Sequence, residues 1–353
     1  METIHETSDD ASSGTEFGFI QPQSIVADDS PAMARPPVQG GLWRHHNFRN
    51  LWIAESISQF GAQISVLALP LTAVLLLDAT PAHMGLLTAA GNLPYLLLGL
   101  FLGLWVARLR RHPLLLLADI VRGVVLLAVP AAWALGVLNL WLIYIIAFTV
   151  GVFSVIFDVS YVSFLPSIVR RDQLVDGNSK LQASNSVAQV AGPSAAGILV
   201  GVVGAPLAVL IDACSYLLSA VFVRRIRVVE SLPERNQARP TRVTAEITDG
   251  LRFVASSPIL RAMLGSSATT TLFGWMFLTV YILYMTRDLG FSSIAVGLVF
   301  GAGGVGALLG SLIAGRLADR LGVGRAIVLG TLVMAVGGIT VPVAVLVPTV
   351  AAP

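Results

Sequence analysis

Stretches of about 20 apolar residues recur along the chain, and the short segments between them carry most of its charge. An α-helix needs about 20 apolar residues to cross the roughly 30 Å hydrocarbon core of a bilayer. Hydrophobic residues make up 55% of the sequence and charged residues 12%, about half the charged fraction of a typical soluble domain. The sequence therefore predicts an all-α polytopic membrane protein.

Nine membrane-spanning helices are predicted from these apolar stretches. Their approximate bounds are 48–77, 82–107, 113–136, 139–162, 182–203, 206–223, 263–286, 292–315 and 326–348.

Basic residues predict how these helices are oriented. Arg44 and Arg49 precede the first helix, and further arginines follow the second, fourth, sixth and eighth helices, whereas the intervening loops have almost none. Because Lys and Arg are enriched in cytoplasmic loops, we expect a cytoplasmic N-terminus and a location in the cell membrane, the plasma membrane of a bacterium. Residues 1–43 are acidic and lack an apolar core, which predicts a disordered cytoplasmic tail.

An internal repeat appears when the chain is shifted by 212 residues, which places GLLTAAG (85–91) on GLVFGAG (297–303). The matching positions include the pairs Gly85 and Gly297, Gly91 and Gly303, Gly103 and Gly315, and Arg108 and Arg320. Two parallel six-helix halves are typical of one large class of secondary transporters. The repeat therefore predicts a transporter architecture.

The stretch GRLADRLGVGR (315–325) is predicted to be a cytoplasmic turn, and it resembles the loop signature of the major facilitator superfamily, Gly-x-Leu-Ala-Asp-Arg-x-Gly. Gly315, Asp319 and Arg320 fit that signature, and the first copy keeps Gly103 and Arg108. The resemblance implies that these five residues belong to a cytoplasmic lock, a contact that holds helices together in one state of transport. Ala107 stands where the first copy should have its Asp, so the lock of the N-terminal half lacks its carboxylate.

The segment AQVAGPSAAG in the fifth predicted helix resembles the antiporter signature of the same superfamily. Gly192, Pro193 and Gly197 carry the match, which implies a bend in this helix; an ordinary small-residue packing face is the alternative. The segments FLPSIVRRDQLVDGNSKLQASNS, LIDACSYLLSA and EITDGLRFVASSPILRAML resemble the branch that contains the enterobactin exporter and the macrolide efflux proteins. In the last of them Ile247, Leu251 and Val254 form one apolar face, as in an interfacial helix.

The resemblance extends over about residues 47–348 and implies the major facilitator fold, with a complete six-helix N-terminal half and the first three helices of the C-terminal half. We expect a tail at 1–43, an N-terminal bundle at 44–227, a cytoplasmic linker at 228–258 and a partial C-terminal bundle at 259–353. Because the family has twelve helices, the chain is expected to be either a fragment or a non-transporting relative.

Ionisable and polar residues inside the predicted helices are candidates for function, because charge is costly in the membrane. Glu55, Gln59 and Gln63 form one polar stripe at i, i+4 and i+8 of the first helix. Glu55 is the candidate proton-coupling group, and both glutamines are assigned to the substrate cavity. A structural carboxylate paired with an arginine of a neighbouring helix is the alternative for Glu55.

Further polar groups lie in helices two to four. Asn92 and Tyr95 flank Pro94 and are candidate cavity residues, with helix–helix hydrogen bonding as the alternative. Asp119 and Arg122 are three residues apart, so they are expected to pair on one helix face as a structural or gating pair. Asp158 is expected to face the cytoplasmic loop arginines.

The sequence argues against an enzyme, because it has no Gly-x4-Gly-Lys-Ser/Thr loop, no metal-ligand spacing and no catalytic arrangement. We expect no cofactor and no nucleic-acid partner; the expected partners are a small-molecule substrate, protons and the lipid bilayer, and the oligomeric state stays open. The predicted function is proton-coupled export of small hydrophobic molecules, either drugs or siderophore-like compounds. A metabolite uptake carrier and a truncated, non-transporting membrane protein are the alternatives.

Overall fold

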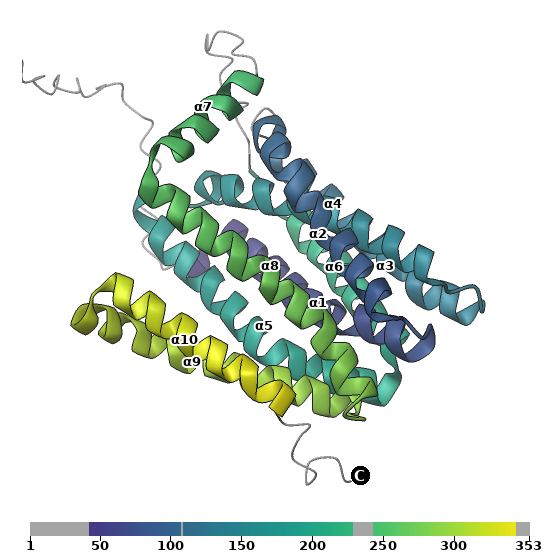
Figure 1. Cartoon of the computed structure of the whole chain (residues 1–353). Helices are drawn as coiled ribbons and strands as arrows, with labels where there is room; N and C mark the ends of the chain where they lie inside the picture. Colours follow the sequence, from purple (N-terminus) through teal and green to yellow (C-terminus); the bar gives the residue numbers. More distant parts are fainter. Residues whose placement is uncertain (1–41, 107–108, 229–242, 344–353) are drawn as a thin grey trace, which may run out of the picture. The chain divides into compact units, whose positions relative to one another are not determined.

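The computed structural model of the chain describes residues 42–106, 109–228 and 243–343 (Figure 1). In this part of the chain every regular element is helical. The elements are η1 (Leu42–Arg44), α1 (His46–Leu76), α2 (Pro81–Val106), α3 (Arg111–Ala134), α4 (Leu140–Ile168), η2 (Arg171–Gln173), α5 (Leu174–Val203), α6 (Ala205–Arg224), α7 (Val243–Ser256), α8 (Pro258–Arg287), α9 (Ser293–Leu321) and α10 (Val323–Val343).

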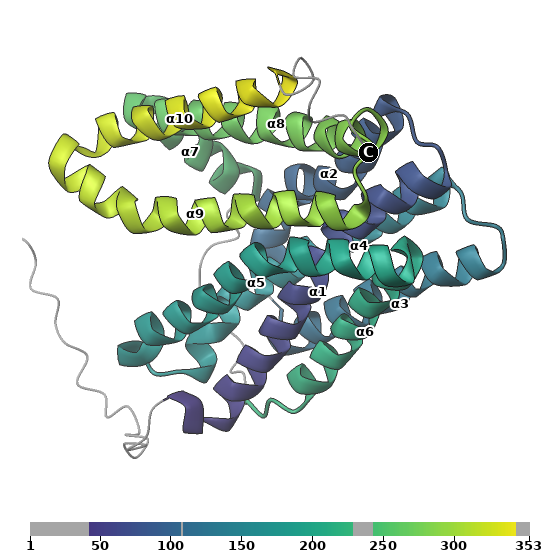
Figure 2. The same ribbon diagram turned by 90° about the horizontal axis from the view of Figure 1, so that it is seen from below.

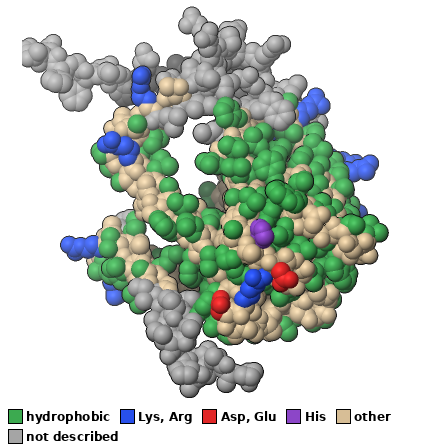
Figure 3. Space-filling model, turned by 45° about the vertical axis from the view of Figure 1, so that its right-hand side comes forward, with side chains coloured by type: hydrophobic (Ala, Val, Ile, Leu, Met, Phe, Trp, Pro, Cys, Tyr) green, Lys and Arg blue, Asp and Glu red, His purple; other side chains and the backbone are tan. Residues whose placement is uncertain are grey.

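The all-α membrane fold predicted from the sequence is confirmed. Within the described residues, seven helices are long and apolar enough to cross a membrane: α1, α3, α4, α5 together with η2, α6, α8 and α9. The other two predicted spans correspond to α2, with 26 residues, and α10, with 21. On the face shown in Figure 3, hydrophobic side chains are spread over the described surface among uncharged groups, and only a few charged side chains interrupt them.

The ends of several helices differ from the predicted bounds. Helix α5 begins at Leu174 rather than near 182, since its first turns are helical although they are polar; Asp176 and Lys180 form a salt bridge in them. Helix α9 continues to Leu321, so most of the stretch predicted to be a turn is helical. The chain reverses at Gly322, whose φ of 82° suits glycine and whose N–H donates to the Ala318 carbonyl (2.9 Å).

Local capping explains where other helices begin. The N–H of Phe48 donates to Nδ1 of His45 at the start of α1 (3.4 Å), and burial, together with the neighbouring His46, lowers the pKa of His45 and so favours the neutral ring that can accept this bond. Asn139 caps α4 by accepting from the N–H of Leu142 (3.0 Å). The helix predicted in the 228–258 linker is α7; the side chains of Ile247 and Leu251 lie outside the described part of the structure.

Five of the first six helices pack around two apolar clusters, and α2 packs on α4 beside them. Helix α1 contacts α5 and α6, α3 contacts α4 and α6, and α2 contacts α4. One cluster surrounds Phe48, Leu115 and Phe164, and the other surrounds Leu71, Leu126 and Val209. Residues of α1, α3, α4, α5 and α6 contribute to both clusters, so these five helices are tied together at two levels along their length.

Of the last three helices, α9 and α8 make the contacts with the first six. Helix α9 packs against α5 on one side and α10 on the other (Figure 2). Helix α8 contacts α2, where Thr88 and Thr279 share a hydrogen bond between their hydroxyl groups (2.8 Å). The α5–α9 contact is therefore the main packing surface between the first six helices and the later ones.

Candidate functional site

A small polar cavity of about 170 Å³ lies among α1, α2, α3, α4 and α6. It is lined by Ser58, Gln59, Ala62, Tyr95, Arg122, Ser154, Phe157, Asp158 and Tyr216. Along α1, its residues fall between Ala54, which belongs to one apolar cluster, and Ile64, which belongs to the other. The polar groups are therefore sandwiched between two packed apolar layers.

The three residues of the polar stripe on α1 do not all lie at the cavity. Glu55 is only 6% exposed, and its Oε1 accepts a hydrogen bond from Nε2 of Gln59 (2.7 Å). Among the described residues, no group hydrogen-bonds Oε2 of Glu55. Gln59 lines the cavity, whereas Gln63, one turn further along, packs against Gly192 of α5. The cavity end of the stripe thus consists of Glu55 and Gln59.

Asp119 and Arg122 of α3 form a buried salt bridge of 2.5 Å, with residue exposures of 0% and 5%. The second oxygen of Asp119 accepts from the Ser219 hydroxyl of α6 (2.7 Å). The Arg122 guanidinium also lies over the rings of Phe157 and Tyr216, 4.3 Å and 4.2 Å from their centroids. Cation–π contacts of this kind stabilise a desolvated arginine, so a carboxylate and two aromatic rings together fix Arg122 in the cavity wall.

Asp158 is not directed at the loop arginines as the sequence suggested. Helix α4 continues to Ile168, which leaves Asp158 well inside the helix, where it accepts a hydrogen bond from the Tyr95 hydroxyl of α2 (2.8 Å). The early end predicted for this helix caused the error. Tyr95 and Asp158 therefore join α2 to α4 across one side of the cavity.

Asn92 does not line this cavity, although Tyr95 does. Helix α2 is continuous through Pro94, and the Asn92 amide donates to the Thr88 carbonyl within the same helix (2.9 Å).

The predicted cytoplasmic lock stays a prediction. Gly315, Asp319 and Arg320 lie in the last two turns of α9, and the side chains of Asp319 and Arg320 are exposed. Within the described residues, neither side chain forms a salt bridge. Gly103 lies in α2, and Arg108 is outside the described residues.

The antiporter-like segment forms helix contacts on two sides of α5. Gly192 packs against α1 at Gln63, and Gly197 packs against α9 at Gly297. The hydroxyl of Ser194 donates to the Gly297 carbonyl (3.3 Å). Helix α5 remains continuous through Pro193. The small residues thus allow close approach of both neighbouring helices.

Asp212 of α6 is a further buried carboxylate close to this region, with an exposure of 0%. Its Oδ1 accepts from the Ser215 hydroxyl (3.1 Å), and within the described part of the chain its Oδ2 has no hydrogen-bond partner. Gly61 of α1 packs directly against these two residues. Asp212 is therefore one of several acidic groups that the first six helices bury near Arg122.

The family model of the Major Facilitator Superfamily matches residues 51–352 of the sequence. The chain belongs to this superfamily. This superfamily consists of membrane transporters and not of enzymes.

Two curated relatives are each 25% identical to the chain. One is the multidrug efflux pump Tap of Mycobacterium tuberculosis (strain ATCC 25618 / H37Rv), matched over 233 residues, 65% of this chain and 53% of that protein. The other is the uncharacterized MFS-type transporter YfiS of Bacillus subtilis (strain 168), matched over 211 residues, 60% of this chain and 49% of that protein. The chain thus spans about half the length of the curated relatives it matches.

Solved structures of the same fold include a bacterial homologue of the human lysosomal transporter Spinster, in inward-facing unoccupied and occupied conformations. Their TM-scores are 0.61 and 0.62 at 15% identity, and they cover 79% and 80% of this chain and 63% of the homologue. At this identity the likeness supports the major facilitator fold of the chain.

Proposed function

We propose that the protein is a secondary active transporter that exports small hydrophobic molecules in exchange for protons. Membership in the superfamily and the similarity to an efflux pump support the transport role. In this proposal the chain sits in the cell membrane with its N-terminus in the cytoplasm. Residues 44–227 form one bundle and 259–353 form part of the second, and the two rock against each other during transport.

The observation that carries the proton-coupling role is the position of Glu55. Its side chain is buried in a helix that spans the membrane, and no salt bridge joins it to another described residue. Gln59 connects it to the cavity, and Arg122, Asp119 and Asp158 are near enough to interact with it electrostatically. A carboxylate in this position can bind a proton and alter the charge of the cavity wall when it does so.

The same cavity supplies the substrate site in this proposal. Gln59 and Tyr95 present an amide and a hydroxyl to the cavity, and Phe157 and Tyr216 present aromatic rings. Three of the nine lining residues are aromatic and most of the others are polar, and small-molecule sites use a few such polar groups to fix the orientation of a substrate. Gln63 and Asn92 would act on the substrate only in a different conformation, since neither lines the cavity in this structure.

The test uses inverted membrane vesicles that contain the full-length protein and a panel of fluorescent efflux dyes. With a proton gradient, wild-type vesicles should accumulate at least one dye, and a protonophore should abolish the accumulation. Glu55→Gln removes the titratable group with little change in shape and should reduce proton-driven transport about a hundredfold or more, the loss typical of a positioned proton-transfer group. Glu55→Asp, which keeps a carboxylate, should retain part of the activity.

Membrane insertion and elution profile are compared for all variants, so that misfolding is separated from loss of coupling. Wild-type transport by Glu55→Gln would remove Glu55 from the mechanism. Export would be contradicted if the wild type moved the dyes in the opposite direction or transported none of them.

A further inference from the structure

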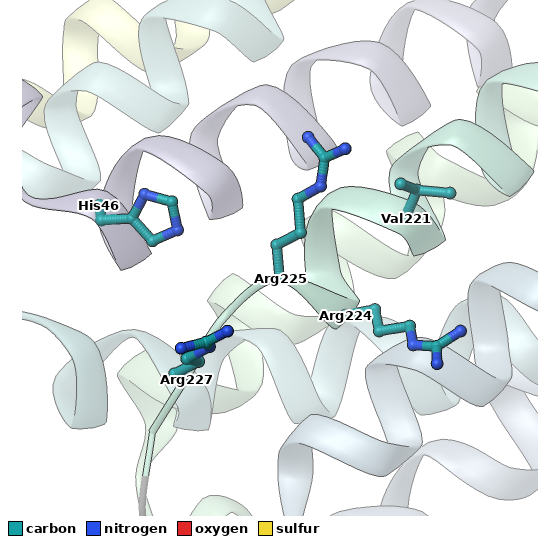
Figure 4. Close-up of a pocket in the computed structure, with 5 residues that line it drawn as sticks. All are labelled: His46, Val221, Arg224, Arg225 and Arg227. Carbon is teal, nitrogen blue, oxygen red and sulfur yellow. The ribbon is translucent and has the colours of Figure 1, made fainter.

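A basic pocket lies where the end of α6 meets the start of α1, apart from the polar cavity described above (Figure 4). It has a volume of about 460 Å³ and is lined by His46, Val221, Arg224, Arg225 and Arg227. In Figure 4 the side chains of His46, Arg225 and Arg227 lie on one side of the α6 end, and Arg224 and Val221 on the other. The described lining therefore contains three guanidinium groups and no carboxylate.

The backbone that carries these arginines is fixed to α1. The amide of Asn47 donates to the Arg227 carbonyl (2.9 Å), and the Arg227 N–H donates to the Asn47 side-chain oxygen (3.1 Å). Ile226, which lies between Arg225 and Arg227, is 3% exposed and belongs to the apolar cluster around Phe48. The pocket is thus built on a rigid frame and not on a loose loop.

The charge of the pocket is uncompensated within the described part of the protein. The salt bridges found there involve Arg122, Arg170, Lys180 and Arg287, and none involves Arg224, Arg225 or Arg227. Arginine keeps its charge at any physiological pH, so the pocket lining carries three positive charges, and the Arg225 guanidinium lies over the Phe222 ring, 5.3 Å from its centroid. An anion in the pocket would balance these charges.

The position of the pocket favours an amphipathic anion. Arg224 is the last residue of a helix that is long and apolar enough to span the membrane, so the arginines follow directly on its apolar part. Val221, one turn earlier on the same helix, also lines the pocket and is 46% exposed. The pocket thus combines an exposed apolar side chain of α6 with three arginines at the end of the same helix, as at a boundary between acyl chains and headgroups.

We propose that this pocket binds the headgroup phosphate of an anionic phospholipid, with the acyl chains lying along α6 at Val221. Guanidinium groups suit phosphate because they can donate two hydrogen bonds to it, and basic pockets between membrane helices are suited to anionic lipid headgroups. His46 adds a polar ring to the lining, and its Nε2 lies 2.9 Å from the Asn50 amide nitrogen. The acidic segment before residue 42 could compete with the lipid for this pocket, but it supplies no acyl chain to lie at Val221.

The experiment titrates the purified full-length protein in detergent with phosphatidylglycerol or phosphatidylcholine of identical acyl chains, and counts bound lipids by native mass spectrometry. The wild type should bind one phosphatidylglycerol more tightly than phosphatidylcholine. Arg225→Gln combined with Arg227→Gln should weaken phosphatidylglycerol binding by about tenfold to thirtyfold, because each arginine near a membrane surface contributes about one kcal/mol. Phosphatidylcholine binding should not change.

The matched control is Arg170→Gln combined with Arg171→Gln, which removes the same charge from another exposed arginine pair. It should bind phosphatidylglycerol like the wild type; an equal loss in both double variants would show unspecific charge attraction and overturn the proposal. Arg225→Lys combined with Arg227→Lys keeps the charge and tests whether the helix end still folds, and it should bind with intermediate affinity.

Two further arms distinguish other anions. If millimolar inorganic phosphate displaces the lipid completely, the apolar side contributes nothing and the lipid assignment fails. A full-length variant with the carboxylates of residues 1–41 neutralised tests the acidic segment. If only that variant binds phosphatidylglycerol, the segment occupies the pocket in the wild type and the proposal is wrong.

Discussion

Replacing Gly297 with alanine should separate α5 from α9. A Cβ atom at Gly297 would lie 2.7 Å from the Cα of Gly197 and 2.7 Å from the carbonyl oxygen of Pro193. Non-bonded carbon atoms prefer a separation of about 3.5–4.0 Å. Both opposing atoms belong to the backbone, so no side-chain rotation can relieve the overlap and the two helices must move apart by about 1 Å.

The expected cost follows from this overlap. Overpacking at a close contact destabilises a protein by about 1–3 kcal/mol, whereas Gly→Ala inside a helix adds about 0.5–1 kcal/mol of stability through helix propensity. Gly303→Ala is the matched control, because it lies on the same helix and a Cβ there would have no atom within 4 Å. Since the propensity gain is common to both variants, their difference of about 1–3 kcal/mol isolates the helix contact.

The assay is reversible unfolding of the purified protein in mixed micelles, followed by circular dichroism. Gly197→Ala should resemble Gly297→Ala, because its Cβ would lie 2.6 Å from the Cα of Gly297. The double variant should lose less than the sum of the single variants, since one separation of the helices relieves both overlaps. If Gly297→Ala is as stable as Gly303→Ala, the two helices do not approach as closely as the structure shows.

The buried polar groups give two further predictions, both measured by the same unfolding assay. Asp119→Asn should cost about 3–5 kcal/mol, because it leaves the Arg122 guanidinium buried without its carboxylate; adding Arg122→Met should restore part of the loss, and strictly additive losses would contradict the pairing. Tyr95→Phe removes the hydroxyl that donates to Asp158 and keeps the ring, so a double-mutant cycle with Asp158→Ala, which removes the acceptor, should give a coupling energy of about 0.5–1.5 kcal/mol. A coupling energy of zero would show that this hydrogen bond does not form.

The positions of the helices could be predicted from the sequence, because hydrophobic length and composition determine which segments can span a membrane. Their ends could not be predicted as well. Helix α4 passes through Pro166 and ends at Ile168, and α9 continues through charged residues to Leu321. Hydropathy falls at such residues although the backbone remains helical, so a prediction from apolar length alone ends these helices too early.

The candidate site was predictable only where a charge interrupts an apolar stretch. Glu55 and the pair Asp119 and Arg122 were found in this way, since ionisable groups are rare inside membrane helices. The aromatic residues Phe157 and Tyr216, which hold the Arg122 guanidinium, gave no comparable signal. An aromatic residue in an apolar stretch can face lipid, the core or a cavity, and only the packing of several helices distinguishes these positions.

The arrangement of apolar contacts bears on how the proposed transporter would move. Helices α1, α3, α4, α5 and α6 share two apolar clusters, which lie on either side of the polar cavity, so these helices are expected to move as one body. Helices α8 and α9 join one of these clusters through Ile282, Met285 and Val296, close to the Gly297 contact, while the far end of α9 is exposed. A rocking motion between the two bodies would therefore turn about the glycine contact, the place where both backbones approach most closely. A substitution that widens this contact should alter transport as well as stability, whereas Gly303→Ala should leave transport close to that of the wild type.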